Sequence, residues 1–179
     1  MVEIIKNKIV TPPCKVLDIG CGTGNYSIYL AQKRFEVTGI DFSENALKIA
    51  RKRAKKTGLK IKFIKADVTK LKDTLTAKFD FILDYSILHH IPDYKTRSYA
   101  RQFSKLLNQK GKLLLVCYSE KDELAQGGYS AKGKYGNTMY YRSVEEIRNA
   151  YKDLHEISFQ EARLGKRLHH LGYSFLFEN

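Results

Sequence analysis

The 179-residue sequence lacks the features that mark secreted, membrane-spanning and disordered proteins. Its three cysteines, Cys14, Cys21 and Cys117, form no C-x-x-C pair, which argues against a disulfide framework and a metal site. With only three prolines and apolar periodicity throughout, disorder is not expected. No run approaches the roughly 20 apolar residues of a membrane helix, and the N-terminus lacks a signal peptide's apolar core. We therefore expect a reduced, cytoplasmic protein without membrane contact.

The apolar pattern predicts seven strands within one α/β domain over residues 1–179. Helical patterns separate the first five strands, which implies right-handed βαβ units and a parallel sheet. The short gap before the last strand suits a hairpin, so that strand should be antiparallel. The expected strands are Lys15–Ile19, Glu36–Ile40, Lys60–Lys65, Phe79–Asp84, Lys112–Tyr118, Glu156–Glu161 and Gly172–Phe177. The expected helices are Tyr26–Lys33, Glu44–Lys56, Tyr94–Asn108 and one that begins after Ser143.

The strongest site signal is a glycine-rich turn after the first predicted strand. Gly20, Gly22 and Gly24 alternate there, directly before a helix. Glycine allows a sharp turn and a close approach of the backbone to a ligand. Asp41 ends the second strand, about 20 residues further on, where an acid can accept hydrogen bonds from ribose hydroxyls. The two features together predict a nucleoside-binding site.

The spacing of these glycines excludes two common phosphate sites. A dinucleotide site has the pattern G-x-G-x-x-G, whereas this chain has G-x-G-x-G. The P-loop pattern G-x-x-x-x-G-K-[ST] is absent as well. The sequence therefore favours a nucleoside ligand without phosphates.

These residues resemble the class I S-adenosylmethionine-dependent methyltransferases over nearly the whole chain. The resembling segments are Asp18–Gly24, Gly39–Ser43, Ile64–Val68, Phe79–Asp84 and Leu106–Lys112, the last with Lys110 where a glycine is common. The resemblance implies a Rossmann-like seven-stranded sheet in the order 3-2-1-4-5-7-6, with helices on both faces. It also implies S-adenosylmethionine as cofactor and S-adenosylhomocysteine as product.

The resemblance assigns roles to individual positions. Gly20, Gly22 and Gly24 would pass under the methionine and ribose parts of the cofactor, while Asp41 would hold the ribose. Other cofactor positions implied by it are Asp18, Asn25, Phe42 on the adenine, Asp67 and Val68 at the adenine edge, and Asp84 and Tyr85 near the methionine and methyl groups. For Asp67 and Asp84 the alternative is a loop cap or a surface acid.

The acceptor site is less clearly marked. His89 and His90 follow the fourth strand, where substrates of parallel sheets bind, and either could orient a nucleophile or simply cap the loop. Tyr118 ends the fifth strand, and Tyr140 lies in a long connection, Ser119–Arg142, of the kind that often covers a ligand. These four residues are candidates for binding substrate. No catalytic residue is assigned, and Cys117 is expected to be a buried thiol.

The charge leaves the acceptor class open. Lysine and arginine exceed acids by 32 to 19, a net charge of +13. The densest basic segment, Lys48–Lys65, should lie at the far end from the ligand edge, where lysines also protect a sheet edge. A second basic group, Arg163, Lys166, Arg167, His169 and His170, falls in the last hairpin turn. That group could meet RNA phosphates, meet an anionic small molecule or remain solvated.

Three functions remain possible at this point. Methyl transfer to a small molecule is favoured because the long connection is nearly neutral and rich in tyrosine, and because segments around Asp84–His90 weakly resemble thiopurine S-methyltransferase-like enzymes. An RNA methyltransferase is the alternative suggested by the charge. A non-catalytic cofactor-binding subunit of a complex is the third. The sequence does not define the oligomeric state.

Overall fold

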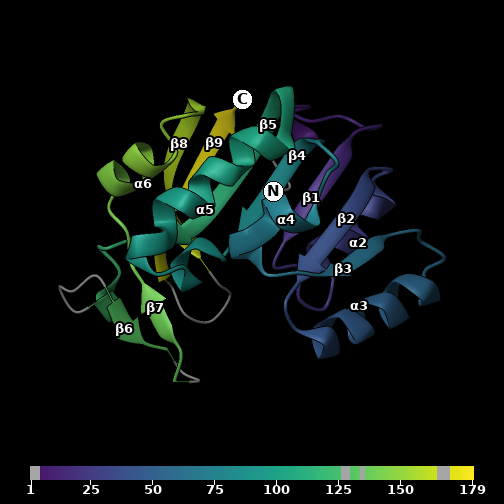
Figure 1. Cartoon of the computed structure of the whole chain (residues 1–179), viewed down its shortest axis with the longest axis horizontal. Coiled ribbons are helices and arrows are strands. Elements are labelled where there is room, and N and C mark those ends of the chain that lie inside the picture. Colours follow the sequence, from purple (N-terminus) through teal and green to yellow (C-terminus); the bar gives the residue numbers. More distant parts are fainter. Residues whose placement is uncertain (1–4, 126–129, 134–135, 165–169) are drawn as a thin grey trace.

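A seven-stranded sheet in the order β3-β2-β1-β4-β5-β9-β8 forms the centre of the fold (Figure 1). The computed structural model describes residues 5–125, 130–133, 136–164 and 170–179. The strands are β1 Lys15–Ile19, β2 Glu36–Asp41, β3 Lys62–Lys65, β4 Phe79–Tyr85, β5 Leu107–Tyr118, β8 His155–Leu164 and β9 His170–Glu178. The predicted order is confirmed, with β8 and β9 as the sixth and seventh strands. β9 is antiparallel to both β5 and β8, as expected.

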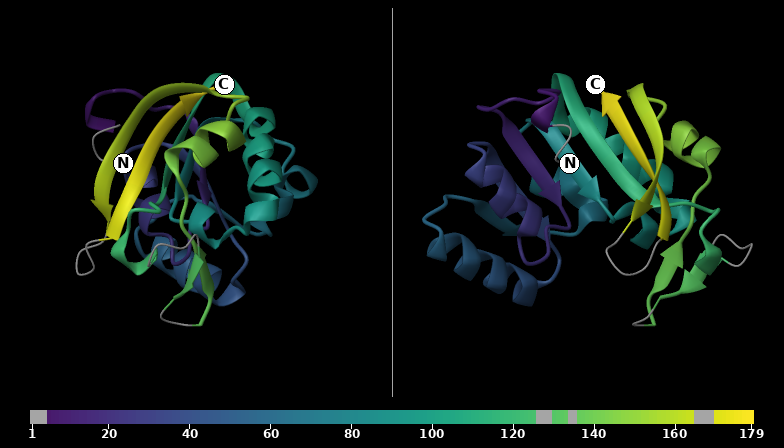
Figure 2. Two further views of the ribbon diagram at one scale, coloured as in Figure 1. Left: turned by 90° about the vertical axis from the view of Figure 1, so that its left-hand side faces the viewer. Right: turned by 180° about the vertical axis from the view of Figure 1, so that it is seen from behind.

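Helices cover both faces of this sheet (Figures 1 and 2). They are α2 Asn25–Gln32, α3 Glu44–Lys56, α4 Leu71–Thr74, α5 Asp93–Leu106 and α6 Val144–Ala150, with short 3₁₀ turns η1 Val68–Lys70, η2 Leu88–His90 and η3 Glu123–Ala125. Ser43 caps α3 by accepting a hydrogen bond from Ala46 N. Ser143 and Glu146 cap α6 reciprocally in a capping box, which the sequence predicted.

Alternation along the strands produces two separate apolar cores. In β1, Val16 packs with the core on the α2 side, and Leu17 packs with the core on the α5 side. In β5, Leu113 and Leu115 belong to the second of these cores, and Leu114 belongs to the first. Because successive strand residues point to opposite faces, a run of apolar residues is needed where both faces are covered. This explains the continuous apolar runs in the sequence.

The short helix α4 was not predicted, β3 begins two residues later than expected, and β8 spans His155–Leu164 rather than Glu156–Glu161. Two larger differences concern β5 and the long connection. Strand β5 begins at Leu107, five residues before the expected Lys112, and Lys110 within it has φ 60°, a conformation that suits glycine. The connection Ser119–Arg142 contains a second small sheet, formed by β6 Ser130–Lys132 and β7 Thr138–Tyr140. Figure 1 shows this hairpin beyond the edge of the sheet to which the arrowheads of β2 and β4 point. Among the described residues, no helix is long and apolar enough to cross a membrane.

Candidate cofactor and acceptor site

A cavity of about 900 Å³ lies at the carboxyl ends of β1, β2 and β4. Parallel α/β sheets bind their ligands at this edge. One wall is formed by the turns after these strands, and the opposite wall by the β6–β7 hairpin. The lining residues are Gly20, Asp41, Phe42, Asp67, Val68, Thr69, Ile87, His90, Ile91, Pro92, Asn137, Thr138 and Tyr140. Seven of these were predicted from the sequence: Gly20, Asp41, Phe42, Asp67, Val68, His90 and Tyr140.

The glycine-rich turn is fastened to the end of β2 by one carboxylate. Gly20, Gly22 and Gly24 all have positive φ angles, 63°, 54° and 82°. Asp41 Oδ2 accepts a hydrogen bond from Gly22 N at 2.8 Å, and Oδ1 accepts one from Ser43 N at 2.8 Å. Only Gly20 of the three glycines lines the cavity. Asp41 therefore orders the turn on which a ligand would rest, and it lines the cavity itself.

Asp18 lies beneath this turn rather than at the cavity. Its side chain is buried, and Oδ2 accepts a hydrogen bond from Ser27 Oγ at 2.5 Å. Burial raises the pKa of Asp18 from 3.8 to about 7, against the lowering effect of the Ser27 hydrogen bond. Asp18 thus connects the end of β1 to α2 and supports the glycine turn from below.

The turns after β2 and β3 form the side of the cavity where an adenine is expected. Phe42 is 77% exposed although it lines the cavity, so its ring is available for stacking. Asp67 Oδ1 accepts hydrogen bonds from Thr69 N and Thr69 Oγ1, both at 2.8 Å, and these bonds lower its pKa. Asp67 therefore does cap the loop, as the structural alternative predicted. It also lines the cavity beside Val68, so the two roles are compatible.

Asp84 is fully buried and does not line the cavity. Tyr99 donates a hydrogen bond from its hydroxyl to Asp84 Oδ2 at 2.7 Å, and Ile87 N donates one to Oδ1 at 3.2 Å. The next residue, Tyr85, packs its ring against Tyr26 with centroids 4.8 Å apart. Neither side chain is among those that line the cavity, whereas the resemblance assigns both to the methionine and methyl groups.

The hairpin wall is held in place by a buried arginine. Arg142, two residues after the end of β7, is only 2% exposed and donates hydrogen bonds to Asp93, to the Ile91 carbonyl and to Thr96 Oγ1. Its guanidinium also lies over the Tyr140 ring at 5.6 Å. Because Asp93 and Thr96 belong to α5, these contacts fix the base of the hairpin to the main fold.

The two histidines after β4 occupy different environments. His90 lines the cavity, where its Nδ1 lies 3.5 Å from Asn137 Nδ2, and burial lowers its pKa. His89 is buried, and desolvation lowers its pKa to about 3, so it is neutral at physiological pH. Its ring stacks on Tyr118 at 4.0 Å, and Tyr118 in turn stacks on His170. Neither His89 nor Tyr118 lines the cavity.

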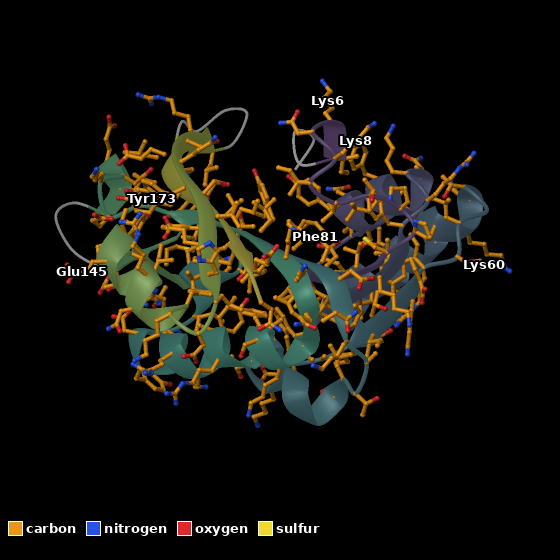
Figure 3. All side chains as sticks on the ribbon, turned by 90° about the horizontal axis from the view of Figure 1, so that it is seen from above. Lys6, Lys8, Lys60, Phe81, Glu145 and Tyr173 are labelled. Carbon is orange, nitrogen blue, oxygen red and sulfur yellow. The ribbon has the colours of Figure 1, made fainter. Side chains whose placement is uncertain are left out.

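The predicted far-end position of the basic segment Lys48–Lys65 is wrong for two residues: Lys65 ends β3 in register with Asp41, at the ligand edge, and Arg53 reaches the glycine turn. Arg53 of α3 donates hydrogen bonds to the Thr23 carbonyl and to Asn25 Oδ1, at 2.8 and 2.7 Å. It therefore holds the outer side of the glycine turn. Asn25 is exposed and bound to Arg53 rather than facing the cavity. Other lysines do point outward, as Figure 3 shows for Lys60.

Several contributors to the site were not predicted from the sequence. Ile87, Asn137 and Thr138 line the cavity. Arg142 holds the base of the β6–β7 hairpin, to which Asn137 and Thr138 belong. No motif surrounds Asn137 or Arg142, since both lie in the long connection. The only available signal was the length of that connection.

Comparison with known proteins agrees with this geometry. The family model described as a methyltransferase domain matches residues 11–170. A ubiquinone biosynthesis O-methyltransferase of Idiomarina loihiensis is 36% identical over 99 residues, 55% of this chain and 40% of that protein. The match thus spans less than half of the relative's length.

Solved structures share the whole fold. A methyltransferase of Methanosarcina mazei, described as S-adenosylmethionine-dependent, superposes with a TM-score of 0.84 at 21% identity, covering 98% of this chain and 96% of that one. The TehB protein of Haemophilus influenzae gives a TM-score of 0.80 at 21% identity, covering 100% and 62%. The family match over residues 11–170, together with this fold, shows that the chain belongs to the class I S-adenosylmethionine-dependent methyltransferases.

Proposed function

We propose that this chain transfers the methyl group of S-adenosylmethionine to an uncharged small molecule. The observation that carries the proposal is the composition of the 900 Å³ cavity. Among the described residues, its lining contains two acids, Asp41 and Asp67, and neither a lysine nor an arginine. A cavity of this kind suits a positively charged cofactor and an acceptor without phosphate or carboxylate groups.

The lining fits the parts of this cofactor. Asp41 is placed to accept hydrogen bonds from ribose hydroxyls, because carboxylate oxygens have more acceptor sites than the two backbone donors use. The exposed ring of Phe42 supplies a face for the adenine, and the Val68 turn supplies backbone polar groups at its edge. The acidic lining also suits the positive sulfonium and amino groups.

When bound, S-adenosylmethionine would supply a methyl group on a sulfonium sulfur, and a lone pair of the acceptor would displace that sulfur from the methyl carbon. The protein's contribution is alignment in a site shielded from water. Ile87, Ile91 and Pro92 provide an apolar wall for the acceptor. His90, neutral because burial lowers its pKa, is placed to accept the proton that an alcohol or amine acceptor must lose.

The relatives named as ubiquinone biosynthesis O-methyltransferases support a small acceptor. The basic turn at the end of β8 is the feature that would support RNA instead. Arg163 and His170 of that turn are described, whereas Lys166, Arg167 and His169 lie outside the described residues. His170 pairs with Asp122 at 3.3 Å, so it is engaged within the protein.

Incubation with methyl-labelled S-adenosylmethionine and an extract of the source organism tests the proposal. The products are separated by size. We expect label in small molecules. Label in RNA would overturn the acceptor class and assign the basic turn to phosphate binding. Cofactor binding without any labelled product would favour the third function, a non-catalytic subunit.

A further inference from the structure

The fold contains a buried polar pair that the proposed chemistry does not use. Asp84 ends β4 and Tyr99 lies in the middle of α5, and both side chains are fully buried. The Tyr99 hydroxyl donates to Asp84 Oδ2 at 2.7 Å. Tyr99 otherwise packs in the apolar core, with its ring edge-on to Phe103 at 5.0 Å. A carboxyl group in such surroundings is costly unless its hydrogen bonds are satisfied.

The second oxygen of Asp84 connects this pair to the cavity. Asp84 Oδ1 accepts a hydrogen bond from Ile87 N, and the Ile87 side chain lies directly against Gly20. A Cβ atom added to Gly20 would be 2.0 Å from Ile87 Cδ1. Both Ile87 and Gly20 line the cavity. The Asp84 carboxylate thus holds Ile87, which packs against Gly20 and lines the cavity.

The turn that carries Ile87 needs such a restraint. Ser86, between β4 and Ile87, has φ 70°, which is uncommon for a residue other than glycine. A residue other than glycine in this region is strained and persists only when its surroundings hold it. The described restraints on the turn include Ser86 N to the Val116 carbonyl at 2.8 Å and Ile87 N to Asp84.

We propose that Tyr99 is a positioning residue of the cofactor site, which through Asp84 holds the turn at Ser86 and sets Ile87 against Gly20. The inference rests on the proposed cofactor binding at this cavity. Tyr99 touches no ligand. Its hydroxyl fixes the orientation of the carboxylate, the carboxylate fixes Ile87, and Ile87 shapes the surface that faces the methionine end of the ligand.

The pair also gives the arrangement a dependence on pH. Burial raises the pKa of Asp84 from 3.8 to about 7, while the Tyr99 hydrogen bond opposes this rise. The other titratable groups that face Asp84 are Cys117 of β5 and Tyr151 after α6, and burial raises the pKa of both, so neither ionises near pH 7. As the pH falls through about 7, Asp84 becomes protonated and its hold on Ile87 N weakens. Cofactor affinity should therefore fall in the same range.

The chain offers a matched control for the tyrosine hydroxyl. Tyr151 is buried in the same core, where it stacks on Phe103 and Phe177, and its hydroxyl has no hydrogen-bond partner among the described residues. Tyr99→Phe and Tyr151→Phe remove the same atom from equally buried rings. Only the first change removes a hydrogen bond to Asp84.

The experiment is a calorimetric titration with S-adenosylhomocysteine between pH 5.5 and 8.5. For Tyr99→Phe we expect affinity three- to tenfold weaker at pH 7.5 and a pH midpoint moved upward, because the carboxylate loses its donor. Tyr151→Phe should match the wild type in both. Asp84→Asn cannot ionise at this position. In that variant the fall of affinity near pH 7, whose midpoint Tyr99→Phe shifts upward, should be absent.

The outcomes separate this inference from the proposed function. If the wild type does not bind S-adenosylhomocysteine, the proposed function fails. If the wild type binds but Tyr99→Phe and Tyr151→Phe have equal affinities and midpoints, the positioning role of Tyr99 is overturned. Should Tyr99→Phe fail to fold, Asp84→Asn decides alone, because an unchanged pH profile in that variant contradicts the role of the pair.

Discussion

The Arg53 guanidinium and the Asn25 side chain form a 2.7 Å hydrogen bond that ties α3 to the first residue of α2. The same Nη1 atom donates to the Thr23 carbonyl at 2.8 Å. Thr23 lies between Gly22 and Gly24, so Arg53 braces the glycine turn from outside while Asp41 holds it from the cavity side. Two side chains of opposite charge thus hold the same glycine-rich turn.

Replacement of Arg53 should therefore weaken cofactor binding without contact between Arg53 and the cofactor. For Arg53→Ala we expect a three- to tenfold loss of S-adenosylmethionine affinity, since hydrogen bonds from a charged group are worth about 1.5–3 kcal/mol when buried and less at this exposed site. Calorimetric titration measures the loss.

The neighbouring lysines provide the control. Neutralising Lys52, Lys55 and Lys56 together should leave affinity and turnover within twofold of the wild type, because all three are exposed. If the lysine variant lost as much as Arg53→Ala, a general effect of charge would explain the result better than bracing of the turn.

Asp41 should be the most sensitive of the cavity acids. Asp41→Ala removes the acceptor for Gly22 N and Ser43 N as well as the expected ribose contact. We expect a loss of about 1.5–3 kcal/mol in cofactor binding, a tenfold to hundredfold change in affinity. A titration with S-adenosylhomocysteine gives the value directly.

Asp80 is the matched control for this change. It accepts hydrogen bonds from Lys15 N and Asn108 Nδ2, at 2.8 and 2.7 Å, near the amino ends of β1 and β4. Asp80→Ala should lower the free energy of unfolding but leave affinity unchanged. Unchanged affinity in Asp41→Ala would refute the ribose role.

Most of the fold followed from the sequence because its signals are local. Alternation of strand and helix, the apolar runs of β4 and β5, and the caps at Ser43 and Ser143 all reside in short segments. The sheet order was implied by resemblance and is confirmed. The β6–β7 hairpin was missed because its strands have three residues each and little apolar patterning.

The site was less predictable because it depends on contacts between distant residues. Gly20, Asp41, Phe42, Asp67 and Val68 could be placed by motif, and they do line one cavity. The sequence could not show that Arg53 reaches 30 residues back to Thr23, or Arg142 49 residues back to Asp93. Such contacts follow from tertiary packing, which leaves no pattern in either segment.

Arg142 should contribute more to stability than other arginines. Arg142→Met removes three hydrogen bonds from a buried guanidinium, so we expect the free energy of unfolding to fall by about 2–4 kcal/mol. Amide hydrogen exchange in β7 should become faster, since the base of the hairpin loses its attachment.

Arg148→Met is the comparison for this effect. Arg148 forms a two-point contact with Glu156, at 2.9 Å in both bonds, but about half of the Arg148 side chain is exposed, against 2% for Arg142. Its loss should cost less than about 1 kcal/mol. If denaturant unfolding showed the same loss of unfolding free energy for Arg142→Met and Arg148→Met, the burial of Arg142 would make no extra contribution to stability.

The buried acids and His89 should make opposite contributions to the way the free energy of unfolding changes with pH. Asp18 has a folded-state pKa of about 7 against 3.8 when unfolded. Its contribution is therefore fully present below pH 3.8 and is lost as the pH rises through 7. For His89, whose pKa falls from 6.5 to about 3, the contribution is present above pH 6.5 and is lost as the pH falls toward 3.

Asp84, whose pKa burial also raises to about 7, behaves like Asp18. Between pH 4 and 6.5 two contributions therefore decline with rising pH while that of His89 grows, so these three groups together should lower the stability of the wild type as the pH rises. Asp18→Asn removes a contribution that declines with rising pH, by up to about 1.4 kcal/mol per pH unit. The stability of this variant should consequently decline less steeply with rising pH than that of the wild type. His89→Gln should change the slope in the opposite direction. Denaturant unfolding at pH 4, 5, 6 and 7 measures all three slopes, and equal slopes would mean that neither group titrates differently in the folded and unfolded states.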